Sequence, residues 1–175
     1  MIFVFCAFFL KMITAKAVKD RSCKMRITLG EVFDSRTILL NLAGTTKEAV
    51  FQELVDSIAL VHPECDKAAM LAALWEREKK LSTGISSGVA IPHAVCSGIG
   101  TIAGAVGISN AGIEYGALDE KPVHIIFLLV MGEVAQENHL RVLDKIFKLV
   151  RTDALTQIKT AKNAQEVYEV ISRYK

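Results

Sequence analysis

His93 has the sequence surroundings that best suit chemistry, because it follows a small-residue loop, a short apolar run and a proline. The segment reads Arg77-Glu-Lys-Lys-Leu-Ser-Thr-Gly-Ile-Ser-Ser-Gly-Val-Ala-Ile-Pro-His93. A histidine that uses one ring nitrogen for orientation can use the other near neutral pH as a nucleophile or phosphoryl acceptor. Pro92 keeps the residue before it extended and removes a ladder donor, so we expect strand pairing to end there. The sequence therefore predicts His93 at a strand end.

The loop before this strand has the composition of an anion-binding loop. Serine, threonine and glycine are turn formers with free backbone N–H groups, and glycine permits a positive φ and close approach of a phosphate. Arg77 would add a permanently charged fork for phosphate oxygens if the loop folds back. The candidate phosphate-binding residues are Ser82, Thr83, Gly84, Ser87 and Gly88.

Each candidate also has a plainer interpretation. A lone histidine at a strand end is more often a hydrogen-bonded structural residue than a nucleophile. Arg77 lies in a charged run, and such runs usually form a solvated helix end. The residue types alone therefore leave both interpretations open.

The segment from Arg77 to His93 resembles the phosphorylation-site region of the fructose/mannitol-type enzyme IIA domains of the bacterial phosphoenolpyruvate-dependent phosphotransferase system (PTS EIIA type-2). That group includes stand-alone nitrogen-regulatory relatives. The resemblance rests on Ala-Ile-Pro-His93 with Arg77 sixteen residues upstream, and on the Ser-Thr-Gly-Ile between them. It runs from about Met25 to Lys175. Two positions depart from the family pattern, namely Ser86, where Gly or Ala is usual, and Ala94, where Gly is common.

A second match is Glu137-Asn-His139-Leu140, which is similar to the His-Leu at the start of a late helix in the family. The resemblance implies that His139 and Arg77 flank a phosphate carried by His93. The plainer interpretation of His139 is a polar residue in a first helical turn.

The resemblance implies a phosphotransferase in which His93 accepts a phosphoryl group from the HPr phosphocarrier protein, without a cofactor or a metal ion. A nitrogen-regulatory role is favoured, because the chain has no segment resembling a IIB or IIC unit. Two alternatives stay open. One is a sugar-specific IIA component that passes phosphate to a separate IIB domain, and the other is a non-enzymatic binding protein that His93 phosphorylation switches towards a regulated target.

Composition limits the function classes. The 175 residues are 51% hydrophobic and 23% charged, which suits one globular domain with a sizeable core. The net charge of +2, with both signs interspersed, offers no basic field for nucleic acid. Four cysteines lie far apart without a Cys-x-x-Cys pair, and His62 with Cys65 lacks a third metal ligand nearby. These features fit a cytoplasmic protein without a structural metal.

Residues 1–24 begin with a continuous apolar run of ten residues followed by basic residues. A bilayer span needs ~20 apolar residues, and export signals carry their positive charges before the run. We expect these residues to be a dispensable N-terminal extension, with the PTS EIIA type-2 domain over 25–175 and no integral membrane insertion. The alternative is a weak membrane-surface anchor.

The remaining pattern predicts an α/β fold, a three-layer α/β/α sandwich with a mixed sheet of about five strands. We expect a helix that Thr45 caps and His62-Pro63 ends, and His124 as a hydrogen-bonded edge residue rather than a ligand. No Rossmann or Walker loop is present, so nucleotide binding is not expected. Strands are expected over 37–42, 89–91, 101–108 and 122–131, and further helices over 65–79, 135–151, 153–159 and from 163 onwards.

Overall fold

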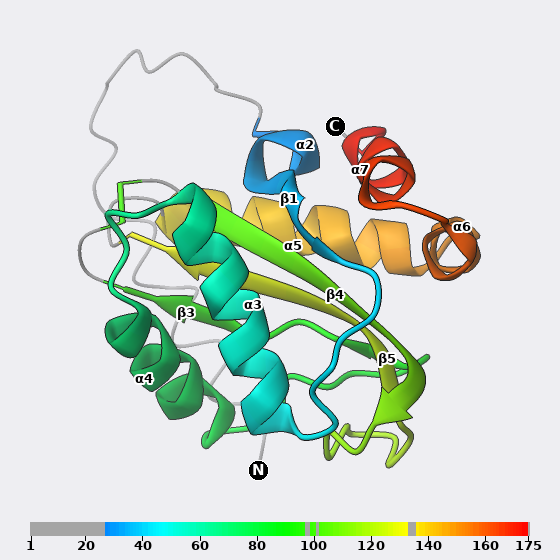
Figure 1. The fold of residues 1–175 in the computed structure, drawn as a ribbon, viewed down its shortest axis with the longest axis horizontal. Coiled ribbons are helices and arrows are strands. Elements are labelled where there is room, and N and C mark those ends of the chain that lie inside the picture. Colours follow the sequence, from blue (N-terminus) through cyan, green and yellow to red (C-terminus); the bar gives the residue numbers. More distant parts are fainter. Residues whose placement is uncertain (1–26, 97–98, 101, 133–135, 175) are drawn as a thin grey trace, which may run out of the picture.

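A computed structural model describes residues 27–96, 99–100, 102–132 and 136–174 of the chain (Figure 1). The expectation for residues 1–24 falls outside the described residues. The elements are, in order, α2 (Leu29–Val32), β1 (Phe33–Leu39), α3 (Lys47–Val61), α4 (Lys67–Glu78), β2 (Val89–Ala90), β3 (His93–Val95), β4 (Ile102–Ile113), β5 (Val123–Met131), α5 (Gln136–Val150), α6 (Ala154–Thr160) and α7 (Ala164–Ser172).

The strands form one five-stranded mixed sheet in the order β1-β4-β5-β2, with β3 also paired to β5. Strand β4 runs antiparallel to β5, whereas β1 pairs in parallel with β4, and β2 and β3 pair in parallel with β5. Strand β5 is therefore central, and β2 and β3 together form one edge of the sheet.

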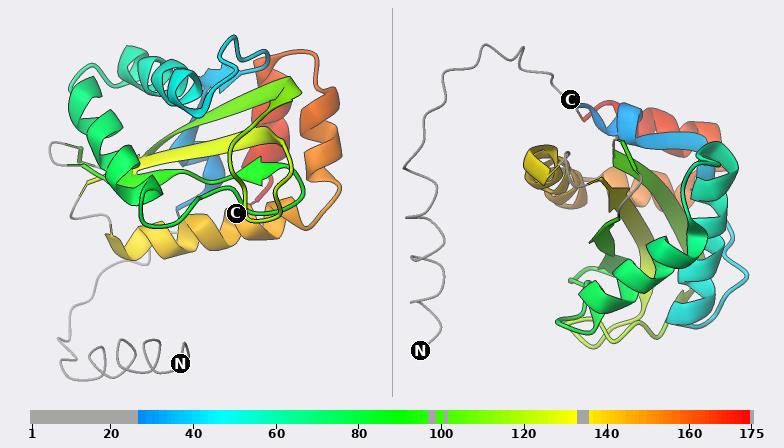
Figure 2. Two further views of the ribbon diagram at one scale, coloured as in Figure 1. Left: turned by 90° about the horizontal axis from the view of Figure 1, so that it is seen from below. Right: turned by 90° about the vertical axis from the view of Figure 1, so that its left-hand side faces the viewer.

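Helices cover both faces of this sheet, as two views at right angles show (Figure 2). Helices α3 and α4 pack on one face in one hydrophobic cluster, and α2, α5, α6 and α7 pack on the other in a second cluster. Strand β5 contributes side chains to both clusters, because Phe127 and Leu129 point to one face and Leu128 and Val130 to the other. The predicted three-layer α/β/α fold is confirmed.

The edge strand differs from the sequence prediction at Pro92. Pairing does not end there, because His93 opens β3 and pairs with Leu129 of β5. The Pro92 carbonyl accepts a hydrogen bond from the Leu129 N–H at 2.9 Å, so Pro92 removes one ladder donor without ending the pairing with β5. His93 therefore starts a strand, and its backbone is fixed on both sides.

The start of the domain also differs from the prediction, which placed the first strand at 37–42. The Glu31 carboxylate accepts a hydrogen bond from the Thr28 N–H at 2.6 Å, so a short capped helix forms first and the strand begins at Phe33. The N-cap of α3 is Thr46 rather than Thr45, since the Thr46 hydroxyl accepts from the Ala49 N–H at 3.2 Å.

Strand β4 is rich in small residues because other elements pack directly on its backbone. A side chain at Gly104 would collide with the Phe33 ring, and one at Gly107 would press on Leu42 of the adjoining loop and on Leu54 of α3. A helix therefore packs closely over this strand at Gly107. The consequence is a tight contact between the sheet and α3, the helix that lies beside α4.

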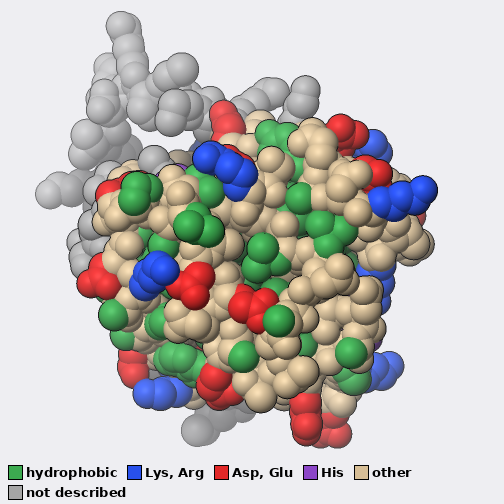
Figure 3. Space-filling view, viewed as in Figure 1, with side chains coloured by type: hydrophobic (Ala, Val, Ile, Leu, Met, Phe, Trp, Pro, Cys, Tyr) green, Lys and Arg blue, Asp and Glu red, His purple; other side chains and the backbone are tan. Residues whose placement is uncertain are grey.

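The face seen in Figure 3 carries Lys and Arg side chains interspersed with Asp and Glu, without a field of one sign. Within the described part of the chain, none of the helices combines the length and the apolar character that a membrane span requires.

Candidate active site

The His93 ring is held through one nitrogen by the backbone behind it. Its Nδ1 lies 2.8 Å from the Ile91 carbonyl oxygen. A carbonyl can only accept, so Nδ1 carries the proton in the neutral ring and Nε2 carries the lone pair. Nε2 is therefore the ring nitrogen that is not tied to the backbone.

Burial keeps this ring neutral. Desolvation lowers the pKa of His93 below its ordinary value, the hydrogen bond to Ile91 opposes that change, and the positive charge of Arg77 lowers the pKa further. A neutral imidazole at physiological pH is the form in which Nε2 can attack.

Arg77, in the last turn of α4, faces that same nitrogen. Its Nε–H donates to His93 Nε2 at 3.2 Å, and its Nη1 donates to the Leu81 carbonyl oxygen at 2.9 Å. Two guanidinium nitrogens are thus engaged within the protein, and the side chain lines the pocket with N–H donors of the kind that bind phosphate oxygens.

His139 comes from the first turn of α5 and lies beside His93. The two ring centroids are 4.9 Å apart with an angle of 47° between the planes. His139 Nε2 is buried and finds no hydrogen-bond partner among the residues that the structure describes. Burial and the neighbouring His93 and Arg77 lower the pKa of His139 to about 4, so its ring is neutral at pH 7. An unpaired buried polar atom facing a pocket is expected at a ligand site.

These three side chains share a pocket of about 460 Å³. Ala73, Glu76 and Lys80 from α4 and the following turn form one wall, and Ala94, Val95 and Met131 from the strands form another. The structure thus brings together His93, Arg77 and His139, which are far apart in the sequence.

The loop residues named from the sequence divide into two groups. Ser82, Thr83 and Gly84 lie between α4 and the sheet edge, but the N–H groups of Thr83 and Gly84 already donate, to the Glu78 carboxylate and to Ser82 Oγ respectively. These two donors are used inside the protein.

Ser87 and Gly88 lie at the other end of β2. Both have positive φ values, 61° and 72°, and form a turn whose Gly88 carbonyl accepts from His124 and Ile125. Val89 pairs with Ile125 and His93 with Leu129, so the turn lies roughly 13 Å or more along the sheet from His93. The structure does not bring Ser87 and Gly88 to the pocket.

Two features of the site were not identified from the sequence. The Ile91 carbonyl that selects the ring tautomer has no signature in a side-chain pattern. Glu78 is only 7% exposed, although its place in the run Arg-Glu-Lys-Lys suggested a solvated helix end. No sequence signal distinguishes a buried carboxylate from its exposed neighbours in such a run.

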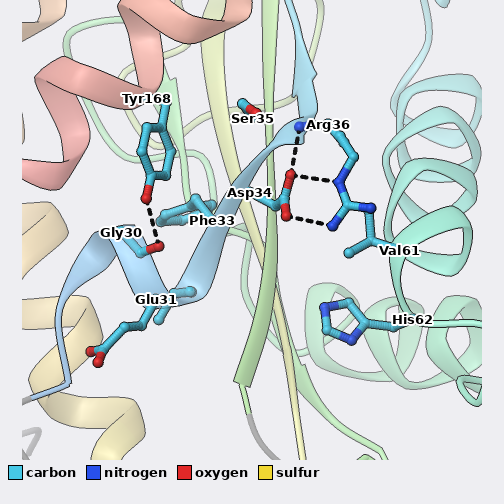
Figure 4. Close-up of a pocket in the computed structure, with 10 residues that line it drawn as sticks. Gly30, Glu31, Phe33, Asp34, Ser35, Arg36, Val61, His62 and Tyr168 are labelled. Atoms are coloured by element: carbon cyan, nitrogen blue, oxygen red, sulfur yellow. Dashed lines mark hydrogen bonds and ion pairs between the residues drawn. The ribbon is translucent and has the colours of Figure 1, made fainter.

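A larger pocket, of about 560 Å³, lies elsewhere, between α2, β1, the end of α3 and α7 (Figure 4). Its charged groups already satisfy one another, since Arg36 Nη2 lies 2.7 Å from Asp34 Oδ2 and this hydrogen bonding lowers the pKa of Asp34 to about 2. Tyr168 donates to the Gly30 carbonyl at 3.3 Å. This arrangement offers no activated nucleophile.

The remaining histidines have structural partners. His124 Nδ1 lies 3.0 Å from the Ser109 carbonyl oxygen, as expected for a hydrogen-bonded edge residue. His62 faces Glu64 at 3.3 Å. Within the described residues, no group of three or more His, Cys, Asp or Glu side chains could hold a metal ion.

The three-layer fold and the grouping of His93, Arg77 and His139 in one pocket point to a family. The family model for the phosphoenolpyruvate-dependent sugar phosphotransferase system, EIIA 2, matches residues 31–174. The chain belongs to this family, and the predicted resemblance is confirmed.

Relatives of two kinds are similar to the chain. The nitrogen regulatory protein of Pseudomonas aeruginosa is 32% identical over 146 residues, which cover 83% of this chain and 95% of the relative. The fructose-specific EIIABC component of the PTS in Bacillus subtilis is 32% identical over 151 residues, 86% of this chain but only 24% of that longer protein.

Solved structures agree. The nitrogen regulatory protein IIA-Ntr of Neisseria meningitidis matches with a TM-score of 0.76 and 30% identity, covering 82% of this chain and 98% of that one. IIA mannitol from Escherichia coli matches with a TM-score of 0.65, covering 79% and 97% of the two chains, and its 14% identity supports the fold alone.

Proposed function

We propose that the chain is a phosphocarrier that accepts a phosphoryl group on Nε2 of His93 from phospho-HPr. The observation that carries the proposal is the arrangement of His93, whose Nδ1 is tied to Ile91 and whose Nε2 faces Arg77. Family membership supports the same chemistry, because its members work in a phosphotransferase system.

The transfer balances without a cofactor. The Nε2 lone pair attacks phosphorus, an N–P bond forms, and the bond from phosphorus to the HPr imidazole breaks with its electron pair returning to that ring. Catalysis of such a loose transition state consists mainly of positioning and charge stabilisation. Arg77 would leave the lone pair for the phosphoryl oxygens, and His139 Nε2, as an N–H donor, would meet another of them.

The surroundings of the pocket favour a protein partner over a small substrate. Leu81, Val95 and Leu140 adjoin the site residues and are 59%, 41% and 70% exposed. Exposed apolar side chains around a shallow opening suit docking of another protein surface. The acceptor would be a IIB domain or a regulated target, and a relative, IIA mannitol, is known in complex with its phosphorylated IIB.

We favour the nitrogen-regulatory type, which the match to nearly the full length of the Pseudomonas aeruginosa relative supports. A sugar-specific IIA role is the second candidate, supported by the match to part of a fructose-specific component. We further propose that the protein acts in the cytoplasm, consistent with free thiols at Cys65 and Cys96.

The test is incubation with enzyme I, HPr and labelled phosphoenolpyruvate. We expect label on the wild-type chain and none on His93→Ala, and undiminished labelling of His93→Ala would contradict the proposal. Pull-downs with both phosphorylation states then separate the roles. A carrier retains only HPr and its acceptor, whereas a regulator also retains a target in one state alone.

A further inference from the structure

A buried ion pair lies directly behind the active site. Lys47, in the first turn of α3, approaches Glu78, the last residue of α4, with Nζ 2.7 Å from Oε1 and side-chain exposures of 18% and 5%. Lys47 Nζ also lies 4.2 Å from the centre of the Tyr115 ring. Charges so far from water are retained only when paired and hydrogen-bonded.

The Glu78 carboxylate accepts hydrogen bonds from the loop that follows α4. Ser82 Oγ donates to it at 3.2 Å, and the Thr83 N–H and hydroxyl donate at 3.1 and 2.6 Å. The Tyr115 hydroxyl lies 2.8 Å from Thr83 Oγ1, and burial raises the pKa of Tyr115, so the phenol stays a donor. Ser82, Thr83 and Tyr115 are therefore joined to Glu78 in one hydrogen-bonded group.

This loop connects to both nitrogens of the catalytic imidazole. The Thr83 carbonyl accepts from the Ile91 N–H at 3.0 Å, and the Ile91 carbonyl accepts from His93 Nδ1 at 2.8 Å. On the other side, the Leu81 carbonyl accepts from Arg77, whose Nε–H faces His93 Nε2. Leu81 thus positions Arg77 beside Nε2, and Thr83 positions the Ile91 carbonyl beside Nδ1.

We propose that Glu78, paired with Lys47, is a positioning residue that fixes the tautomer and orientation of His93 through Thr83 and Ile91 without touching the phosphate. Its kinetic consequence rests on the proposed function, whereas its effect on the ring does not.

The role requires a carboxylate rather than any polar group. Both oxygens of Glu78 accept, one from Lys47 and one from Thr83, with Ser82 sharing the first. A glutamine at this place would turn its amide NH₂ towards one of these donors and leave Lys47 without a counter-charge. The loop would then shift, and with it the position of the Ile91 carbonyl that accepts from His93 Nδ1.

The experiment measures the His93 imidazole of the full chain by long-range ¹H–¹⁵N NMR, without phosphate. We expect one Nδ1–H tautomer in the wild type and a mixture of tautomers in Glu78→Gln. Phosphoryl transfer from phospho-HPr should slow by about 10-fold or more in Glu78→Gln with the KM for phospho-HPr changed by less than about 2-fold, as expected when only orientation is lost. Glu78→Asp, which keeps the charge, should restore part of the Nδ1–H tautomer population and part of the transfer rate.

The matched control is Asp56→Asn, which breaks an exposed ion pair of the same 2.7 Å length to Lys67, and it should leave the His93 signals and the rate unchanged. Thr83→Val removes one hydroxyl and keeps the ion pair, and it should shift the His93 tautomer in the same direction. If Glu78→Gln does not fold, Thr83→Val alone tests the positioning role.

Wild-type His93 signals in folded Glu78→Gln, or in Thr83→Val when only that variant folds, would overturn the proposal, even if transfer were slower. If the tautomer shifts but the wild type accepts no phosphate, the positioning role stands and the proposed function fails.

Discussion

Arg77 donates its Nε–H to His93 Nε2 across 3.2 Å, so the arginine covers the lone pair of the nitrogen that we propose as the nucleophile. The same guanidinium has three further N–H groups beyond its contact to Leu81, and these form a fork that matches phosphate oxygens. We infer that Arg77 shields the neutral nucleophile before transfer and binds the transferred group afterwards. Arrival of the phosphoryl group would replace a hydrogen bond to a neutral nitrogen with hydrogen bonds to charged oxygens.

Comparing two replacements of Arg77 distinguishes the effect of its charge from the effect of its planar geometry. We expect Arg77→Ala to lower the single-turnover rate of phosphoryl acceptance by about 10²-fold, because a donor that meets transition-state charge is lost. Arg77→Lys should recover only part of this loss, since an ammonium cannot bind two oxygens in parallel. Rapid quenching with labelled phospho-HPr measures both rates.

Lys79→Gln provides the control, because it removes a positive charge from the same helix end at a side chain 68% exposed. Equal rates for Arg77→Ala and Lys79→Gln would rule out a specific role for Arg77.

The pH dependence of phosphoryl acceptance follows from the lowered pKa of His93. Protonation removes the Nε2 lone pair, and burial delays that protonation to more acidic pH than in a free histidine. We therefore expect an acceptance rate that stays level as pH falls from 8 to about 6.5 and declines only below it. A midpoint at or above that of a free histidine, measured with the donor held saturating, would contradict the buried neutral ring.

Stability should depend on His139 over an acidic window. The folded pKa is about 4, below the ordinary value of 6.5, so between these values the unfolded chain binds more protons than the folded one. The stabilising effect of the neutral ring is complete above about pH 6.5 and is lost as pH falls towards 4. We expect the thermal midpoint of the wild type to fall more steeply over this range than that of His139→Gln. Parallel curves in calorimetry would show that His139 titrates normally.

The two histidines should not be interchangeable. His139 Nε2 is buried beside His93 without a partner among the described residues, and we expect it to donate to a phosphate there, whereas His93 and its backbone support remain when His139 is removed. We expect His139→Ala to accept phosphate from phospho-HPr slowly, by about 10²-fold, or to pass it on poorly. Full-speed acceptance and onward transfer by this variant would exclude the assigned role.

Residues 1–24 should be dispensable. The family model begins at residue 31, and the two clusters of the described core are built from Ile27 onwards. A chain that starts at Met25 should keep its rate of phosphoryl acceptance and its thermal midpoint. A large drop in that midpoint would show that the apolar run packs against the domain.

Much of the fold follows from local patterns. The apolar run over 122–131 predicted a strand, and β5 is buried on both faces. The helix expected from 163 onwards is α7, where Asn163 Oδ1 accepts from the Glu166 N–H at 3.0 Å. Local signals misplaced the first strand, at 37–42 instead of 33–39, and missed the short capped helix α2 before it.

The site was predicted less evenly. His93, Arg77 and His139 were found through a motif, and the structure places them together. Ser87 and Gly88 matched the composition of an anion-binding loop, yet they serve a turn at the other end of β2, since composition cannot tell which end of a strand a loop faces. The proposed role of Glu78 depends on its ion pair with Lys47, which lies 31 residues earlier in the sequence, in α3. A local sequence pattern does not reveal such a contact between two helices.

The most direct test of the central claim is the position of the phosphate on the wild-type chain after reaction with enzyme I, HPr and phosphoenolpyruvate. ³¹P NMR with ¹⁵N-labelled histidine distinguishes the two ring nitrogens and the individual histidines. We predict one phosphohistidine, with phosphorus bonded to Nε2 of His93 and with Nδ1 still protonated against the Ile91 carbonyl. Phosphate on Nδ1 of His93, or on His139, would contradict the account.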